Sequence, residues 1–415
     1  MNERLIVKSF GPVKELDITF KKVTLFIGDQ GTGKSCIAKL FSMFKWLEKV
    51  LSQKKYKQNY FEQYNRFLTK LCSYHRIDSF VQADSFLMFE SKHYIFEYQK
   101  GSFRIYNNEN IGGLFQTNET SEDANGLAKI MYIPAERSIV SVAENKIKLL
   151  KELPDSSETF SDEFVNAKKF FKSGYELPLE GFRFEYDTLN EVGWISDGNY
   201  KVRLINASSG IQSSLPMCMV SEYLSQMVSA REEVKLSKEE KDRLEKRVAE
   251  IMQDNAISDS IKDMMIRQLS SANRYDCFIN VVEEPELSLF PESQMEVLRS
   301  LVAINASSEQ NMLVLTSHSP YSLAILNMLI MGAKVYKKAS EDDKAIIENI
   351  LPHKYHLDEN EVAAYRLSSK DENYCASIIS EKTGMIAKND LDSCSDEINR
   401  IFNQLYRLYA NTFAK

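Results

Sequence analysis

The feature that most constrains this chain is a short glycine loop, Gly28-Asp29-Gln30-Gly31-Thr32-Gly33-Lys34-Ser35. An apolar run over residues 23–27 precedes the loop, and residues 37–51 repeat apolar side chains every three or four positions. The first pattern predicts a buried strand and the second a helix with one buried face. A strand, a loop of the form G-x-x-x-x-G-K-[ST] and a helix together predict a site that binds the phosphates of a nucleotide.

Each residue type in the loop has a reason to be there. The glycines let backbone N–H groups turn toward phosphate oxygens, and the start of the helix adds its dipole. We expect Lys34 to reach the β- and γ-phosphates and the hydroxyl of Ser35 to ligate Mg²⁺. The predicted cofactors are therefore ATP and Mg²⁺. The predicted nucleotide-binding residues are Gly28, Asp29, Gln30, Gly31, Thr32, Gly33, Lys34, Ser35 and Cys36.

A second candidate element is an apolar strand over residues 278–282 that ends in Glu283 and Glu284. In phosphate-transfer sites the first carboxylate of such a pair helps to hold Mg²⁺, and the second polarises the attacking water. We therefore predict Glu283 as a metal ligand with Ser35, and Glu284 as a catalytic residue. The other interpretation is a solvated acidic turn, because Glu286 adds a third carboxylate.

Two further candidates follow the same logic. His318 lies three residues after the apolar run over residues 312–315, and a neutral imidazole there could form a hydrogen bond with the γ-phosphate or the attacking water. Ser208, Ser209 and Gly210 open a predicted helix and could bind an anion. A plain helix cap is the alternative for these three residues, because serine is a preferred N-cap residue.

Composition narrows the class of protein. The chain has 415 residues and a net charge of −7, which argues against a basic nucleic-acid coat. The sequence contains no apolar run long enough for a membrane span and no recognisable secretion signal. The six cysteines are scattered without a C-x-x-C pair, which excludes a zinc ribbon and favours a reducing, cytoplasmic location.

In chain order these motifs resemble the ATP-binding-cassette ATPases, in the soluble branch that includes SMC, Rad-fifty, RecF and OLD proteins. The resemblance implies an α/β fold of the P-loop type, with a mixed sheet and an inserted helical subdomain. The segments over residues 133–137 and 316–321 are similar to stand-alone bacterial AAA-family ATPases of anti-phage defence operons, such as those of Septu and certain retrons.

The resemblance also implies a mechanism. Two protomers would pair head to tail around ATP, with Ser208 and Gly210 acting on the nucleotide of the partner. Glu284 would be the general base and His318 the switch histidine. Ala207, Ser209 and Ile211 depart from the usual signature motif, so we expect a slow ATPase.

We expect a split ATPase head over residues 1–335, with insertions at about 52–128 and 230–272, and a C-terminal cap over residues 336–415. The cap would end in an amphipathic helix over residues 395–409. Residues 230–272 are charged and helical in pattern, which suits a solvated helix pair or a docking arm. Three functions stay open: an ATP-driven switch that controls a nuclease or toxin, a RecF-like ATPase acting on DNA, and a nucleotide-binding scaffold with little hydrolysis.

Overall fold

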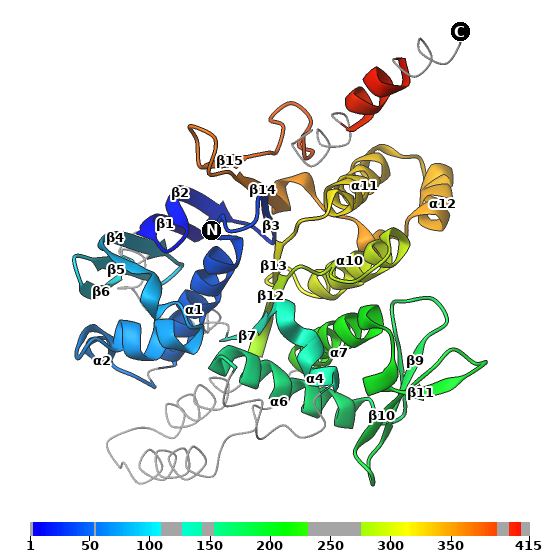
Figure 1. The fold of residues 1–415 in the computed structure, drawn as a ribbon, viewed down its shortest axis with the longest axis horizontal. Helices are drawn as coiled ribbons and strands as arrows, with labels where there is room; N and C mark the ends of the chain where they lie inside the picture. The colour runs from blue at the N-terminus through cyan, green and yellow to red at the C-terminus, as the bar shows by residue number, and fades with distance from the viewer. Residues whose placement is uncertain are drawn as a thin grey trace, which may run out of the picture.

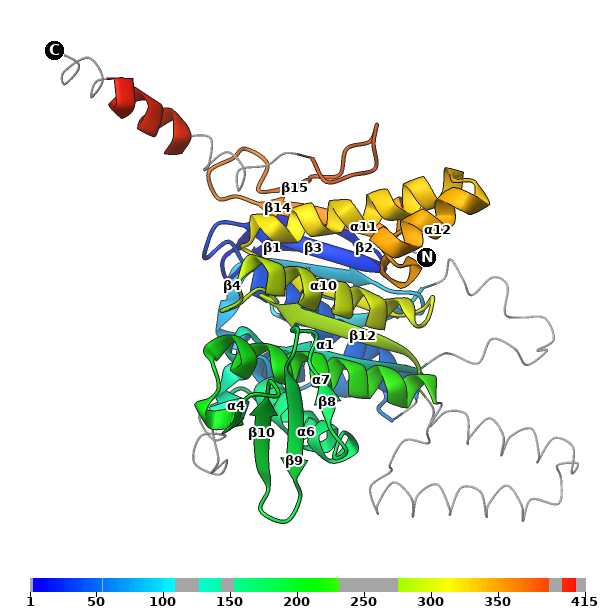
Figure 2. The same cartoon turned by 90° about the vertical axis from the view of Figure 1, so that its right-hand side faces the viewer.

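The computed structural model describes residues 3–53, 55–108, 127–142, 153–230, 275–387 and 398–407. Two sheets enclose the first long helix, and further helices cover the outer face of the larger sheet (Figures 1 and 2). Within the described residues, no helix combines the length and the apolar character that a membrane span requires.

The larger sheet has six strands in the order β15-β14-β3-β13-β12-β7, and only β15 runs antiparallel to its neighbour. Its strands are β3 (Val23–Gly28), β7 (Leu127–Ile133), β12 (Tyr275–Glu283), β13 (Met312–Thr316), β14 (Val362–Leu367) and β15 (Cys375–Ser377). Strand β12 is buried from Cys277 to Glu283, as expected for a parallel strand that is covered on both faces.

One face of this sheet packs against α1 (Lys34–Ser52). On the other side of α1 lies an antiparallel sheet in the order β2-β1-β4-β5-β6. Its strands are β1 (Glu3–Phe10), β2 (Val13–Phe20), β4 (Val81–Glu90), β5 (Tyr94–Gln99) and β6 (Ser102–Asn107). Because α1 lies between two apolar surfaces, apolar residues appear on most of its circumference.

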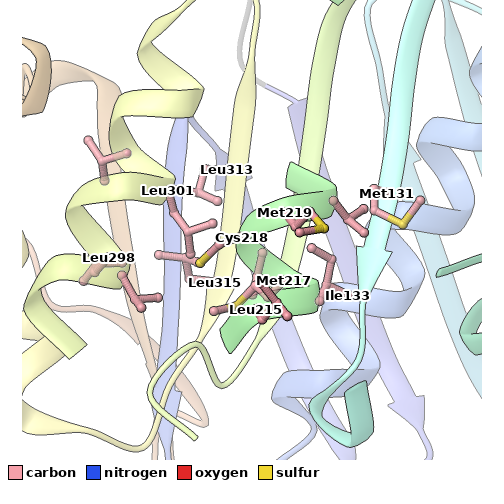
Figure 3. Close-up of a cluster of buried hydrophobic side chains, with 14 of the residues drawn as sticks. Met131, Ile133, Leu215, Met217, Cys218, Met219, Leu298, Leu301, Leu313 and Leu315 are labelled. Carbon is pink, nitrogen blue, oxygen red and sulfur yellow. The ribbon is translucent and has the colours of Figure 1, made fainter. Parts of the chain in front are cut away.

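The opposite face of the six-stranded sheet is covered by longer helices. These are α6 (Asp155–Phe170), α7 (Ser209–Ser229), α10 (Pro291–Ala306) and α11 (Pro320–Lys338). Figure 3 shows Met217 and Met219 of α7 on the side of Ile133 and Met131 of β7, while Cys218 lies toward Leu301 of α10. These side chains fix α7 against the strands that carry the predicted catalytic residues.

The remaining described elements lie around these layers. A small antiparallel sheet in the order β11-β10-β9-β8 projects beside α7 (Figure 1). Its strands are β8 (Tyr175–Glu176), β9 (Arg183–Asp187), β10 (Val192–Ser196) and β11 (Lys201–Arg203). The short helices are α2 (Gln58–Glu62), η1 (Phe67–Cys72), η2 (Asp78–Phe80), η3 (Ala135–Ser138), α4 (Ile139–Val142), η4 (Leu204–Asn206), α12 (Glu341–Ile350), η5 (His353–Tyr355) and η6 (Glu359–Glu361).

This architecture confirms the predicted α/β fold with a mixed sheet. The central sheet extends beyond residue 335, where we expected the head to end, because β14 pairs with β3 along its whole length. Within the expected insertion at about 52–128, strands β4, β5 and β6 join β1 in one sheet. The charged segment 230–272 lies, apart from its first residue, outside the described residues.

Candidate functional site

The glycine loop joins β3 to α1 and adopts backbone angles that most residues avoid. Gly28, Gly31 and Gly33 all have positive φ angles, of 142°, 74° and 85°. A Cβ atom at Gly28 would lie 2.1 Å from the carbonyl oxygen of Leu367, on the neighbouring strand β14. At Gly31 a Cβ atom would meet no described atom within 4 Å. The loop is therefore packed at its base and open at its tip.

Lys34 folds back over this loop. Its Nζ donates hydrogen bonds of 2.8 Å to the backbone carbonyls of Gly28 and Asp29. Burial lowers the pKa of Lys34 to about 8, against the opposing effect of Glu284 and other nearby carboxylates. No described side chain caps the N-terminus of α1, so its first N–H groups keep their capacity to bind an anion.

The chain beyond β14 braces the same loop. The hydroxyl of Tyr374 donates to the carbonyl of Thr32, and the Nζ of Lys370 lies 3.3 Å from the carboxylate of Asp29. We had not predicted either residue, because neither belongs to a recognisable motif. Of the other predicted loop residues, Gln30 is exposed, and Cys36 is buried in the core so that only its backbone can meet a ligand.

Glu283 ends β12 next to the start of α1. Its side chain is nearly inaccessible, at 4% exposure, and burial raises its pKa. The charge of Lys39 and the hydroxyls of Tyr132 and Ser35 act in the opposite direction. Oxygen Oε1 is buried and receives no hydrogen bond of normal geometry from any described residue.

These features fit a site for Mg²⁺. A carboxylate oxygen and a serine hydroxyl are hard ligands that this ion accepts, usually together with waters and phosphate oxygens. The unsatisfied Oε1 of Glu283 would gain a cationic partner there. The predicted pair of Ser35 and Glu283 is therefore brought together by the fold.

Glu284 follows directly and has an unusual backbone. Its φ angle is +44°, in the left-handed region that non-glycine residues seldom occupy. Its N–H donates to the carbonyl of Thr316 at the end of β13, over 2.9 Å. This turn points the carboxylate out of the sheet, where its Oε1 lies 3.7 Å from Nε2 of His318. Strain of this kind persists only where the surroundings fix it, and it clusters at functional sites.

His318 is held by a carboxylate that we interpreted only as part of an acidic turn. Oε1 of Glu286 accepts hydrogen bonds from the backbone N–H of His318, at 2.6 Å, and from the hydroxyl of Ser317, at 3.0 Å. Burial, and then the charge of Lys34, lower the pKa of the His318 imidazole. The ring is therefore neutral at pH 7 and can accept or donate one hydrogen bond.

The backbone of both glutamates is held by Arg137, which lies in η3 directly after β7. Arg137 is 1% exposed, and its guanidinium donates to the carbonyls of Glu283 at 2.6 Å and Glu284 at 2.7 Å. It also donates to Pro134 at 3.2 Å and to Ser213 of helix α7 at 3.1 Å. One buried side chain thus connects β7, the acidic end of β12 and α7.

A proline in α7 contributes to this connection. Pro216 lacks an N–H, so the carbonyl of Gln212, four residues earlier, loses its helical partner. The hydroxyl of Ser141 donates to that carbonyl at 2.7 Å. The adjacent carbonyl, of Ser213, is the one that Arg137 binds. An arginine after a strand and a proline inside a helical pattern were the signals available in the sequence.

Ser208, Ser209 and Gly210 lie away from Lys34. They line a separate depression together with residues 288–290. The side chain of Ser208 caps α7, accepting from the N–H of Ile211 at 3.5 Å, so the capping interpretation holds for this residue. The fold therefore gathers the loop, Glu283, Glu284 and His318 in one place, and it leaves the Ser208–Gly210 turn on another surface.

Comparisons with known proteins add a structural likeness. No protein-family model matches this chain, and no curated protein matches its sequence. Its structure is similar to the SMC head domain from Thermotoga maritima, with a TM-score of 0.30 and 12% identity over 78% of this chain and 91% of that one. It is also similar to an Smc head bound to the C-terminal winged-helix domain of ScpA, with a TM-score of 0.33 and 12% identity over 92% and 98% of the two chains.

A third similar structure is the recombination mediator protein RecF, with a TM-score of 0.27 and 11% identity over 77% of this chain and 92% of that one. Because these TM-scores and identities are low, they describe a likeness of fold and carry no functional conclusion. The function has to be argued from the site itself: an open glycine loop, a buried lysine and two glutamates beside a neutral histidine.

Proposed function

We propose that this chain binds and hydrolyses ATP, and that ATP controls its association with other proteins. The observation that carries the proposal is the position of Lys34, Glu283, Glu284 and His318 around the open end of the glycine loop. The charge of Glu284 raises the pKa of Lys34 against the effect of burial, which supports a role for both side chains at one ligand.

In this proposal each group of residues has a separate role. The loop N–H groups and Lys34 hold the phosphates, while Ser35 and Glu283 hold Mg²⁺. Bound Mg²⁺ would neutralise charge that develops on the phosphate oxygens. Glu284 accepts a proton from the attacking water, and the neutral ring of His318 orients that water or donates to the γ-phosphate.

The proposed switch is a head-to-tail dimer. Ser208 and Gly210 lie on a surface apart from the loop of their own chain, so a second protomer is needed to bring that turn to a nucleotide. We further propose that closure of this dimer controls a partner effector, a nuclease or toxin in anti-phage defence. A chain with an acidic net charge of −7 suits a protein partner better than tight, nonspecific DNA binding.

The test of hydrolysis compares the wild type with Glu284→Gln, which keeps the shape of the side chain and removes the base. We expect turnover to fall by about 100-fold or more while ATP still binds. Equal turnover in the two proteins would exclude Glu284 as the base. An undetectable wild-type rate with intact binding would indicate a nucleotide-binding scaffold.

Copurification with the protein encoded next to this one, with and without ATP, tests whether ATP controls the binding of an effector. A complex whose stability changes with ATP supports the switch, and the absence of a complex in both conditions contradicts it. Hydrolysis stimulated by DNA, with no effector present, would favour a RecF-like role in its place.

A further inference from the structure

The metal end of the proposed site has a second layer of residues behind it, on the face of the sheet that packs against α1. Strands β7 and β12 run parallel, and Tyr132 pairs with Val281. Both side chains pack in the core around α1, so they point to the same face of the sheet. Glu283 lies two residues beyond Val281 and points to that face as well, because side chains alternate along a strand. The fold thus places a tyrosine next to the predicted metal ligand.

Tyr132 and Glu283 are both buried and incompletely bonded. Tyr132 is 5% exposed and Glu283 is 4% exposed. Neither the hydroxyl oxygen of Tyr132 nor Oε1 of Glu283 forms a hydrogen bond of normal geometry with a described residue. Buried polar groups without partners are rare in folded proteins, and each one calls for an explanation. Two of them on one face of neighbouring strands indicate that a bound group completes this site.

The tyrosine hydroxyl also acts on the charge of the carboxylate. Burial raises the pKa of Glu283, and the charge of Lys39 and the hydroxyls of Tyr132 and Ser35 oppose that effect. Groups that oppose it stabilise the ionised carboxylate, which is the form that binds a metal ion. Lys39 and Ser35 belong to α1, whereas Tyr132 belongs to the sheet itself. Glu283 is therefore contacted from the helix on one side and from the neighbouring strand on the other.

The ring of Tyr132 has a fixed position. The buried imidazole of His75 packs edge-on against it, with 4.9 Å between the ring centroids and 73° between the ring planes. His75 follows η1, so part of the expected insertion at about 52–128 reaches the back of the metal site. A phenol confined in this way has little freedom to turn its hydroxyl away from Glu283.

We infer that Tyr132 is a positioning residue for Glu283 and that it sets the preference of the site for Mg²⁺. Its hydroxyl donates to one carboxylate oxygen and thereby keeps the other directed at the ion. Mg²⁺ demands short bonds in near-ideal octahedral geometry, whereas Ca²⁺ accepts flexible sites with longer bonds. A carboxylate that is held from behind therefore favours Mg²⁺. This role rests on the proposed function, because it takes Glu283 as a metal ligand.

Calorimetry of ATP binding tests this role without a measurement of catalysis. The full chain carries Glu284→Gln, so that the nucleotide stays intact, and ATP is titrated in excess Mg²⁺, in excess Ca²⁺ and in EDTA. Adding Tyr132→Phe should weaken ATP binding in Mg²⁺ by about 10-fold or more, the usual effect of losing a partner of a metal ligand. Binding in Ca²⁺ should change much less. Binding in EDTA should not change, because Lys34 and the glycine loop are untouched.

Two comparisons separate positioning from a general effect on the fold. Tyr175→Phe removes a hydroxyl that is equally buried, at 5% exposure, and that lies beside Glu222 in the core on the other face of the sheet. It should leave ATP binding unchanged in all three conditions. In a Glu283→Ala background, Tyr132→Phe should cause no further loss in Mg²⁺, because the effects of two residues that act as a pair are not additive.

Two results would overturn the role of Tyr132 as a positioning residue. One is an equal loss of ATP binding in Mg²⁺, in Ca²⁺ and in EDTA, which would mean that the hydroxyl only supports the fold. The other is a full additional loss in the Glu283→Ala protein, which would mean that Tyr132 does not act through Glu283.

The response of the parent protein to Mg²⁺ separates this role from the proposed function. If Mg²⁺ strengthens ATP binding equally with and without Tyr132→Phe, the proposed nucleotide site stands and the role of Tyr132 fails. If the parent protein binds no ATP, or binds it no better in Mg²⁺ than in EDTA, the metal site of the proposed function fails and the role of Tyr132 fails with it.

Discussion

Replacing Arg137 by methionine removes the guanidinium and keeps a side chain of comparable length. The variant loses the hydrogen bonds to the carbonyls of Pro134, Ser213, Glu283 and Glu284. All four carbonyls then lack the donor that connected three separate elements. We therefore expect a lower free energy of unfolding and a displaced carboxylate at Glu284.

The expected change in the free energy of unfolding combines two opposing contributions. Hydrogen bonds to a charged group contribute ~1.5–3 kcal/mol each, so four at the lower value amount to about 6 kcal/mol. Burial lowers the pKa of Arg137 from 12.5 to about 10, and a difference of that size corresponds to ~3 kcal/mol against the charged form. We therefore expect Arg137→Met to lower the free energy of unfolding by about 3 kcal/mol.

Denaturant unfolding followed by fluorescence measures this change. The control is Arg4→Met, since Arg4 forms only a solvent-exposed pair with Asp17, which should contribute ~1 kcal/mol or less. In the more conservative Arg137→Lys protein, one ammonium cannot bind all four carbonyls. Its kcat for ATP should fall about 100-fold, as for a displaced catalytic group, with KM nearly unchanged. Unfolding of Arg137→Met at the wild-type midpoint, or unchanged kcat in Arg137→Lys, would refute the reasoning.

Three further predictions concern the nucleotide site. Burial lowers the pKa of Lys34 to about 8, so ATP affinity measured by calorimetry should fall as the pH rises through about 8 and the ammonium loses its proton. The variant Lys34→Ala should not bind ATP, and wild-type affinity in that variant would contradict the role of Lys34. Gly28→Ala should lower the melting temperature much more than Gly31→Ala, since only the first Cβ meets the carbonyl of Leu367; equal melting temperatures would show that β14 does not pack there. Glu283→Ala should raise the Mg²⁺ concentration needed for half-maximal hydrolysis by at least about 10-fold, and an unchanged requirement would place the ion elsewhere.

The nucleotide loop and the acidic end of β12 could be predicted because each is local. A strand, a glycine turn and a helix lie within thirty residues, and their patterns are set by neighbours along the chain. The same holds for the turn at Glu283 and Glu284, where a buried strand meets charged residues. Here the local preferences of the chain agree with the global fold.

What could not be predicted depends on pairings across long separations. Strand β14 is six residues of ordinary composition, and its partner β3 lies more than three hundred residues earlier. The burial of Arg137 is equally invisible, because arginine is exposed in most proteins and only the folded carbonyls around it explain its position. The bracing by Tyr374 and Lys370 depends on β14 in the same way.

The pairing of β3 between β13 and β14 has a consequence for biosynthesis. The ribosome makes β3 long before the two strands that flank it, which come from residues 312–316 and 362–367. At ~5–20 residues per second, the apolar segment over residues 23–28 waits roughly 20–70 s for its last neighbour. Until both β13 and β14 have been made, a nascent chain exposes at least one unpaired edge of β3 and a glycine loop that β14 does not yet support. The proposed ATP binding would therefore arise only after residue 367 has been made, and chains released before that point would lack it.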